Sequence, residues 1–149
     1  MSPTTLTPQE IALLQLEKAL KLYLGGEELV CAITLAGAAE EILGKLAYAN
    51  GKTPSLERRV NHKMGLFKAI FPNKPIPLKK VFVYLSNQSR NAMKHLTTTT
   101  PITVDLEQEA SRLLARAVEN YVLLFGRETP HMRRFQAKRL KGVRLHGVA

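Results

Sequence analysis

Hydrophobic residues along this chain recur mostly at three- and four-residue steps, the spacing that places them on one face of an α-helix. The first such run begins after Thr7, whose hydroxyl can cap a helix, while Pro8 suits the first turn and Glu10 completes a capping box. Two glycines at positions 25–26 end the run. The pattern therefore predicts a helix from Pro8 to this glycine pair.

The rest of the pattern predicts four more helices and no strand. They cover about residues 27–50, 55–71, a segment from Pro77 past Met93, and the segment between Asp105 and Gly126. The second predicted helix contains LVCAITLAGAA, which is apolar nearly all round and typical of a central helix packed on several neighbours. PNKPIP must be a loop, because three prolines exclude a helix interior. The expected fold is all-α, an up-and-down bundle of four to five helices.

Charge separates the end of the chain from the rest. Of the net charge of +10, residues 127–149 carry +6 and residues 1–126 carry +4. We therefore divide the chain into a helical bundle over 1–126 and a basic C-terminal extension over 127–149. In one interpretation Phe135 and Leu140 hold a short basic helix against the bundle, and in the other the extension is flexible. Its charge suits RNA backbone or an anionic membrane surface, and equally a merely solubilising segment.

Composition excludes several classes of function. Cys31 is the single cysteine, so no internal disulfide or cysteine zinc cage can form. Its apolar neighbours predict a buried thiol. This use of cysteine fits a cytoplasmic protein. The histidines lack metal-ligand spacing and no Gly-rich phosphate loop is present, so neither a metal nor another cofactor is expected. The N-terminus lacks a secretory pattern, and the longest apolar run is well short of the roughly 20 residues of a membrane span.

The stretch SRNAMKHL, residues 89–96, carries the side chains that point to chemistry. Metal-free RNA cleavage needs a group that moves a proton near neutral pH, which His95 can supply. It also needs a cation on the phosphate, which Arg90 can supply, and Asn91 can orient the imidazole or bind phosphate. We take these three residues as the candidate catalytic set.

The spacing of these residues does not decide the matter alone. On an ideal helix Asn91 and His95 share a face, while Arg90 lies about 140° from His95. Arg139 and His146 in the extension satisfy the same loose spacing. A basic helix end is also stabilising by itself, by about 0.3–1 kcal/mol. A helix end without catalytic function therefore remains an open alternative.

SRNAMKHL resembles the Arg-x4–6-His motif of the HEPN superfamily, in which a polar residue, often Asn, directly follows the arginine. Asn91 matches that detail, whereas the copy in the extension has Leu140 there. HEPN domains are all-α bundles with the motif late in the bundle, as it is here. AITLAGAAEEILGKL in the second predicted helix is also similar to small bacterial HEPN-like proteins. The resemblance covers residues 8–125.

The resemblance implies a metal-independent endoribonuclease, with Arg90 on the scissile phosphate, His95 as general acid or base and Asn91 as orienter. It implies a homodimer in which two motifs form one cleft, and a role as a toxin or in antiviral defence, with a cognate antitoxin as partner. Toxin members whose antitoxin modifies them carry a tyrosine two residues after the histidine, where this chain has Thr97. Other members only bind nucleotide, RNA or protein, which is the alternative function.

Two further groups of charged residues are candidates for supporting roles. Either Glu40 or Glu41 can face inward and aim Arg90, unless both mark the solvent edge of their helix. A basic face is predicted on the third helix, and it either lines an RNA groove or is a solvated helix face. The residues expected to bind RNA are Arg58, Arg59, Lys63 and Lys94.

Overall fold

The structure is a computed structural model that describes residues 3–94 and 101–146. These residues form six α-helices and no strand, which confirms the all-α class. The helices are α1 (Pro8–Gly25), α2 (Leu29–Ala49), α3 (Ser55–Ile70), α4 (Lys79–Lys94), α5 (Leu106–Phe125) and α6 (Pro130–His146). The first five correspond to the predicted helices, and the sixth lies in the basic extension. The described part of residues 1–126 thus contains five helices, within the expected four to five.

Local capping chemistry explains where the best-predicted helices begin and end. Thr7 and Glu10 form the expected capping box, in which the Glu10 amide donates to Thr7 Oγ1 at 3.2 Å and the Thr7 amide donates to Glu10 Oε2 at 2.7 Å. Asp105 Oδ1 accepts from the Gln108 amide at 2.9 Å and caps α5. The glycine after α5, Gly126, has φ +65°, a left-handed conformation that ends the helix.

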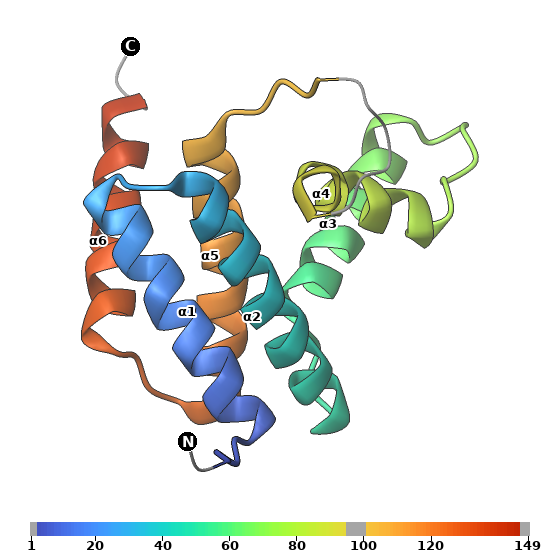
Figure 1. Ribbon diagram of the computed structural model, residues 1–149. Helices are drawn as coiled ribbons and strands as arrows, with labels where there is room; N and C mark the ends of the chain where they lie inside the picture. Colours follow the sequence, from blue (N-terminus) through green and yellow to red (C-terminus); the bar gives the residue numbers. More distant parts are fainter. Residues whose placement is uncertain (1–2, 95–100, 147–149) are drawn as a thin grey trace.

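The hydrophobic core lies between α1, α2 and α5, which run side by side in Figure 1. Buried alanines such as Ala32, Ala36 and Ala39 let α2 pack closely on both neighbours. Leu16 and Leu20 of α1 and several apolar residues of α5 fill the space between the helices. None of the helices in the described ranges is long and apolar enough to cross a membrane.

The extension contributes to this core through α6, which lies along α1 (Figure 1). Met132 and Phe135 are fully buried, and the Phe135 ring meets the Tyr23 ring edge-on with centroids 5.5 Å apart. Leu140 is instead 66% exposed. Of the two interpretations of the extension, the packed helix is the one observed, with Phe135 rather than Leu140 as the residue that holds it.

The α3–α4 pair lies on the other side of α2 (Figure 1) and meets the bundle differently. Among the described side chains of α4, the buried ones are Ser86 and Asn87, both polar. Of its large apolar residues, Val81, Tyr84 and Leu85 are exposed, whereas Met93 near its end packs against the core. Apart from Met93, the contact of α4 with α2 and α5 is made by polar side chains, and we call it the polar seam.

Cys31 is exposed, so the prediction of a buried thiol was wrong. It lies near the start of α2, where the next two residues, Ala32 and Ile33, are buried. Adjacent helix positions point about 100° apart, so apolar sequence neighbours do not ensure burial.

Candidate functional site

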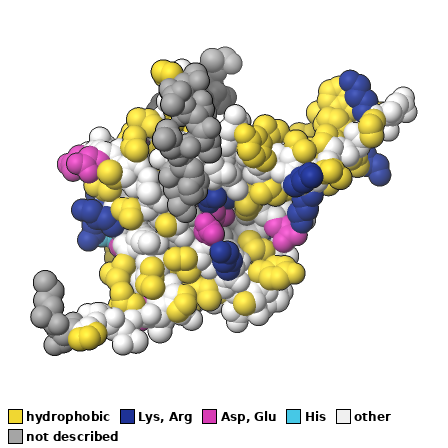
Figure 2. Space-filling view, turned by 45° about the vertical axis from the view of Figure 1, so that its right-hand side comes forward, with side chains coloured by type: hydrophobic (Ala, Val, Ile, Leu, Met, Phe, Trp, Pro, Cys, Tyr) yellow, Lys and Arg dark blue, Asp and Glu magenta, His cyan; other side chains and the backbone are white. Residues whose placement is uncertain are grey.

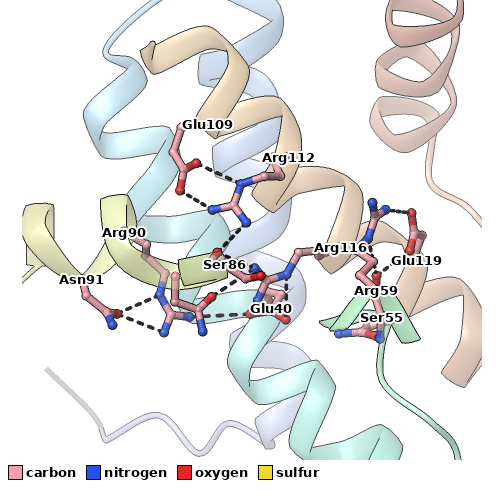
Figure 3. Close-up of polar contacts among 12 residues, drawn as sticks. Glu40, Ser55, Arg59, Ser86, Arg90, Asn91, Glu109, Arg112, Arg116 and Glu119 are labelled. Atoms are coloured by element: carbon pink, nitrogen blue, oxygen red, sulfur yellow. Dashed lines mark hydrogen bonds and ion pairs between the residues drawn. The ribbon is translucent and has the colours of Figure 1, made fainter. Parts of the chain in front are cut away.

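The centre of the polar seam is a buried carboxylate between two guanidiniums. Glu40 on α2 is 4% exposed, and Arg116 on α5 is 1% exposed. Arg116 Nε donates to Glu40 Oε1 at 3.2 Å, and Arg116 Nη2 lies 2.9 Å from Glu40 Oε2. Arg90 Nη1 on α4 lies 3.6 Å from the same Oε2 atom. Figure 3 shows the three side chains converging from three helices.

Arg116 is the most deeply buried cation of this cluster, and its neighbours explain how it is accommodated. Burial lowers the pKa of Arg116, the nearby Glu40 raises it, and the guanidinium stays charged at physiological pH. Arg116 Nη1 also donates to Asn87 Oδ1 at 3.0 Å and to the Ser86 carbonyl at 3.3 Å. These contacts make Arg116 the link between α2, α4 and α5.

Arg90 is held in a defined orientation by residues on two helices. Its Nε and Nη2 atoms donate to Asn91 Oδ1 at 3.4 and 3.3 Å, and its side chain is 14% exposed. The aliphatic part of the side chain crosses α2 at Gly37, where a Cβ atom would lie 2.6 Å from Arg90 Cδ. Glycine at this position leaves the room that Arg90 occupies.

The side chains of the neighbouring residues Glu40 and Glu41 leave α2 in different directions. Glu40 points inward to Arg90 and Arg116, as described above. Glu41 is half-buried, and its Oε1 accepts from Lys45 Nζ at 2.9 Å on the same helix. The sequence left two alternatives, one inward carboxylate or both at the solvent edge, because the choice depends on cations far away in the sequence.

Not all of the candidate catalytic set can be located. The structure brings Arg90 and Asn91 together and adds Glu40 to them. His95 lies outside the described residues, and so does the side chain of Lys94. No position relative to Arg90 is therefore assigned to either of them.

A cavity of about 530 Å³ lies beside Arg90, between α2, α3 and α4. Glu40, Asn87 and Arg90 provide polar groups to its wall, and Tyr48 and Val83 provide apolar ones. In Figure 2, charged side chains of both signs gather among hydrophobic ones on one face of the molecule. The volume and this mixture of groups are typical of a site for a small molecule or a few nucleotides.

A second hollow, which we call the basic groove, lies between α3, α4 and α5 and has a volume of about 400 Å³. Three of the residues expected to bind RNA line it: Arg58, Arg59 and Lys63. Arg59 pairs with Glu119, and Arg58 Nη2 lies 3.7 Å from Glu119 Oε2. Lys63 Nζ donates to Ser86 Oγ at 3.1 Å.

Sequence reasoning missed two further cations of the basic groove, Arg112 and Arg116. Arg112 is held by Glu109 through two hydrogen bonds of 2.9 and 2.6 Å, and it also donates to the Ser86 carbonyl (Figure 3). The two arginines are four residues apart in RLLAR, so they share a face of α5. The four-residue spacing indicates a shared face, but the apolar residues around it are typical of a core-facing helix.

Comparisons with known proteins do not identify the chain. No protein-family model matches it, and no curated protein or solved structure gives a significant match. Among the described residues, no group of three or more His, Cys, Asp or Glu side chains is placed to hold a metal ion.

Proposed function

We propose that this protein is a metal-independent endoribonuclease of HEPN type, with a catalytic set of Arg90, Asn91 and His95. The observation that carries the proposal is the sharing of Glu40 by two guanidiniums next to a cavity. One carboxylate cannot neutralise both Arg90 and Arg116. This cluster therefore carries one positive charge in excess, and Arg90 presents it to the cavity, where a phosphate can meet it.

The electrostatics of the cluster suit a reaction that builds charge on phosphate. Glu40 and Arg116 are almost fully buried, so their charges interact in a medium that screens them weakly. Arg90, held by Glu40 and Asn91, is oriented before a substrate arrives and loses little entropy on binding it. Preorganised donors of this kind are the usual source of transition-state stabilisation.

The proton transfers are assigned to His95 on the strength of the motif. In the proposed reaction the 2′-hydroxyl attacks the adjacent phosphorus, the 5′-oxygen leaves, and a 2′,3′-cyclic phosphate forms. His95 acts as general base to the 2′-hydroxyl or as general acid to the leaving oxygen. The unperturbed pKa of a histidine side chain, which lies near neutral, suits either task.

A homodimer completes the proposal, with two motifs forming one cleft. The exposed apolar residues Val81, Tyr84 and Leu85 on α4, the helix that carries Arg90, support contact with a second copy. The proposed setting is a cytoplasmic toxin or defence function, controlled by an antitoxin protein.

The activity is tested by incubating purified protein with end-labelled RNA in EDTA and characterising the products. The proposal predicts cleavage that EDTA does not suppress and fragments that end in 2′,3′-cyclic phosphate. Intact RNA, or fragments with 3′-hydroxyl ends, would rule out the proposed reaction.

A non-catalytic module that binds RNA, nucleotide or a protein partner is the second candidate function. It is favoured by the extent to which Arg90 is already engaged, since Glu40 and Asn91 both contact its guanidinium. An arginine in that position can orient a bound phosphate without taking part in its cleavage. RNA retained without cleavage in the same assay would favour this function.

A further inference from the structure

Cations outnumber carboxylates in the basic groove. Five cationic side chains line it, and Glu119 is the one carboxylate among the described lining residues. Glu109 and Glu40 pair with Arg112 and Arg116 from outside the groove. Five cations are thus matched by three carboxylates. Several cationic side chains at once would stabilise an anion bound here.

Lys63 is the cation with the least compensation. Its ammonium donates to the hydroxyl of Ser86, and no carboxylate of the described residues lies within ion-pair distance of it. Burial lowers the pKa of Lys63, and the positive charges of Arg112, Arg116 and Arg59 lower it further. A lysine placed among three guanidiniums is poorly stabilised unless a further negative charge is supplied.

The polar groups around Lys63 are arranged on rigid helices. Ser86 belongs to the buried seam of α4, and its carbonyl is fixed by Arg112 and Arg116. On α3, Arg59 Nε donates to Ser55 Oγ at 3.2 Å, so this guanidinium is also held in place. Among the residues that the structure describes, Arg58 makes a 3.7 Å contact with Glu119 and no side-chain hydrogen bond, so it keeps donors for a ligand. The donors are therefore positioned before any ligand binds.

We propose that the basic groove is a phosphate-binding site centred on Lys63, with Arg58 and Ser86 as further contacts. A phosphate group offers several acceptor oxygens and more than one negative charge, which matches a lysine beside several arginines. The groove volume of about 400 Å³ accommodates a group of mononucleotide size. The ligand is a phosphate ester, either a free phosphorylated small molecule or a backbone phosphate of RNA. The site does not depend on RNA cleavage.

Calorimetric titration with pyrophosphate, a 5′-mononucleotide and a short single-stranded RNA tests the site. Lys63→Gln is compared with Lys18→Gln, which removes an exposed lysine of α1 outside the groove. We expect Lys63→Gln to weaken binding of at least one of these ligands about tenfold or more, because it removes a charge-assisted contact. Lys18→Gln should bind like the wild type. No binding by the wild type, or equal binding by both variants, would overturn the proposal.

A second readout uses the wild-type protein alone. Limited acetylation mapped by mass spectrometry follows modification of the Lys63 amine and of the exposed Lys18 amine in the same sample. A bound phosphate should protect Lys63 and leave Lys18 unchanged. Acetylation of Lys63 that no phosphate ligand slows would contradict the site.

The two proposals fail separately. Protection of Lys63 by pyrophosphate in a protein that leaves RNA intact would support the groove and remove the endoribonuclease. RNA cleavage without protection of Lys63 by any ligand would support the endoribonuclease and remove the phosphate site in the groove. Stronger binding of RNA than of the mononucleotide would identify the ligand as a nucleic-acid backbone, whereas equal or weaker binding of RNA would identify a small phosphorylated molecule.

Discussion

Glu40 and Glu41 are adjacent in the sequence but have different environments, because their side chains leave α2 in directions about 100° apart. Glu40 is buried between Arg90 and Arg116, whereas Glu41 pairs with the exposed Lys45. An apolar pattern could show that one carboxylate interrupts a buried helix. It could not show which cation compensates it, since Arg116 follows Glu40 by 76 residues.

Replacing Glu40 should be far more damaging than replacing its neighbour. Glu40→Gln leaves Arg116 buried without an anion, so we expect the free energy of unfolding to fall by about 3–5 kcal/mol. Glu41→Gln removes a surface pair and should cost about 0–1 kcal/mol. Urea denaturation of both variants measures the difference, and equal losses would contradict the role of Glu40 as the central counter-ion.

Two helical glycines give a matched test of the space that Arg90 occupies. Gly65→Ala on α3 meets no atom within 4 Å and should stabilise the protein by about 0.5–1 kcal/mol, the usual gain in a helix. Gly37→Ala places a methyl group against Arg90 Cδ, so the side chain must leave Glu40 and the gain should be lost. The free energies of unfolding of the two variants are compared. An equal gain at both positions would mean that Arg90 is not held against Gly37 and Glu40.

The lowered pKa of Lys63 predicts a pH dependence of stability. Its pKa in the folded state lies below the value of 10.5 that it has when unfolded, so between these two values the unfolded chain binds more protons. The free energy of unfolding should therefore rise with pH through that window, because deprotonation removes the charge of Lys63 from the groove. In urea denaturation over this range, the free energy of unfolding should rise less steeply with pH for Lys63→Gln than for Lys18→Gln. Parallel curves would show that burial and the neighbouring arginines do not lower the pKa of Lys63 in the folded protein.

At the scale of the helices, the sequence predicted α1, α2, α3 and α5 to within a few residues, because caps, glycines and prolines mark their ends. It predicted less about what each helix faces. Val81 and Leu85 belong to the periodic stripe of α4, yet both are exposed and the buried positions of α4 are polar. Periodicity identifies a face of a helix, but the neighbour that covers it is a tertiary property.

The sixth helix offers the clearest test at this scale. Phe135→Ala removes a fully buried ring from the contact of α6 with α1 and should lower the free energy of unfolding by about 3–5 kcal/mol. Leu140→Ala, at an exposed position of the same helix, should change it by at most about 0.5 kcal/mol. Chemical denaturation followed by circular dichroism compares them. A negligible loss for Phe135→Ala would mean that α6 does not stabilise the bundle.

For the molecule as a whole, the main feature is one polar network that joins the two hollows. It runs from Lys63 through Ser86 and Arg116 to Glu40, and from there to Arg90. The sequence analysis selected Arg90 and Asn91 from the SRNAMKHL motif and Lys63 from the basic face predicted on the third helix. It did not find that one buried arginine lies between both hollows, since that depends on how α2, α4 and α5 pack.

His95 is proposed to act with Arg90 in metal-free RNA cleavage, and one comparison of histidine variants tests this role. His146→Ala is the matched control, because Arg139 and His146 have the same loose spacing in the basic extension. Initial rates of cleavage of a labelled RNA in EDTA are measured for the wild type and both variants. We predict that His95→Ala loses at least about 100-fold in rate, as removal of a general acid or base usually does, while His146→Ala keeps the wild-type rate. Equal rates for all three proteins, or no cleavage by the wild type, would contradict the account.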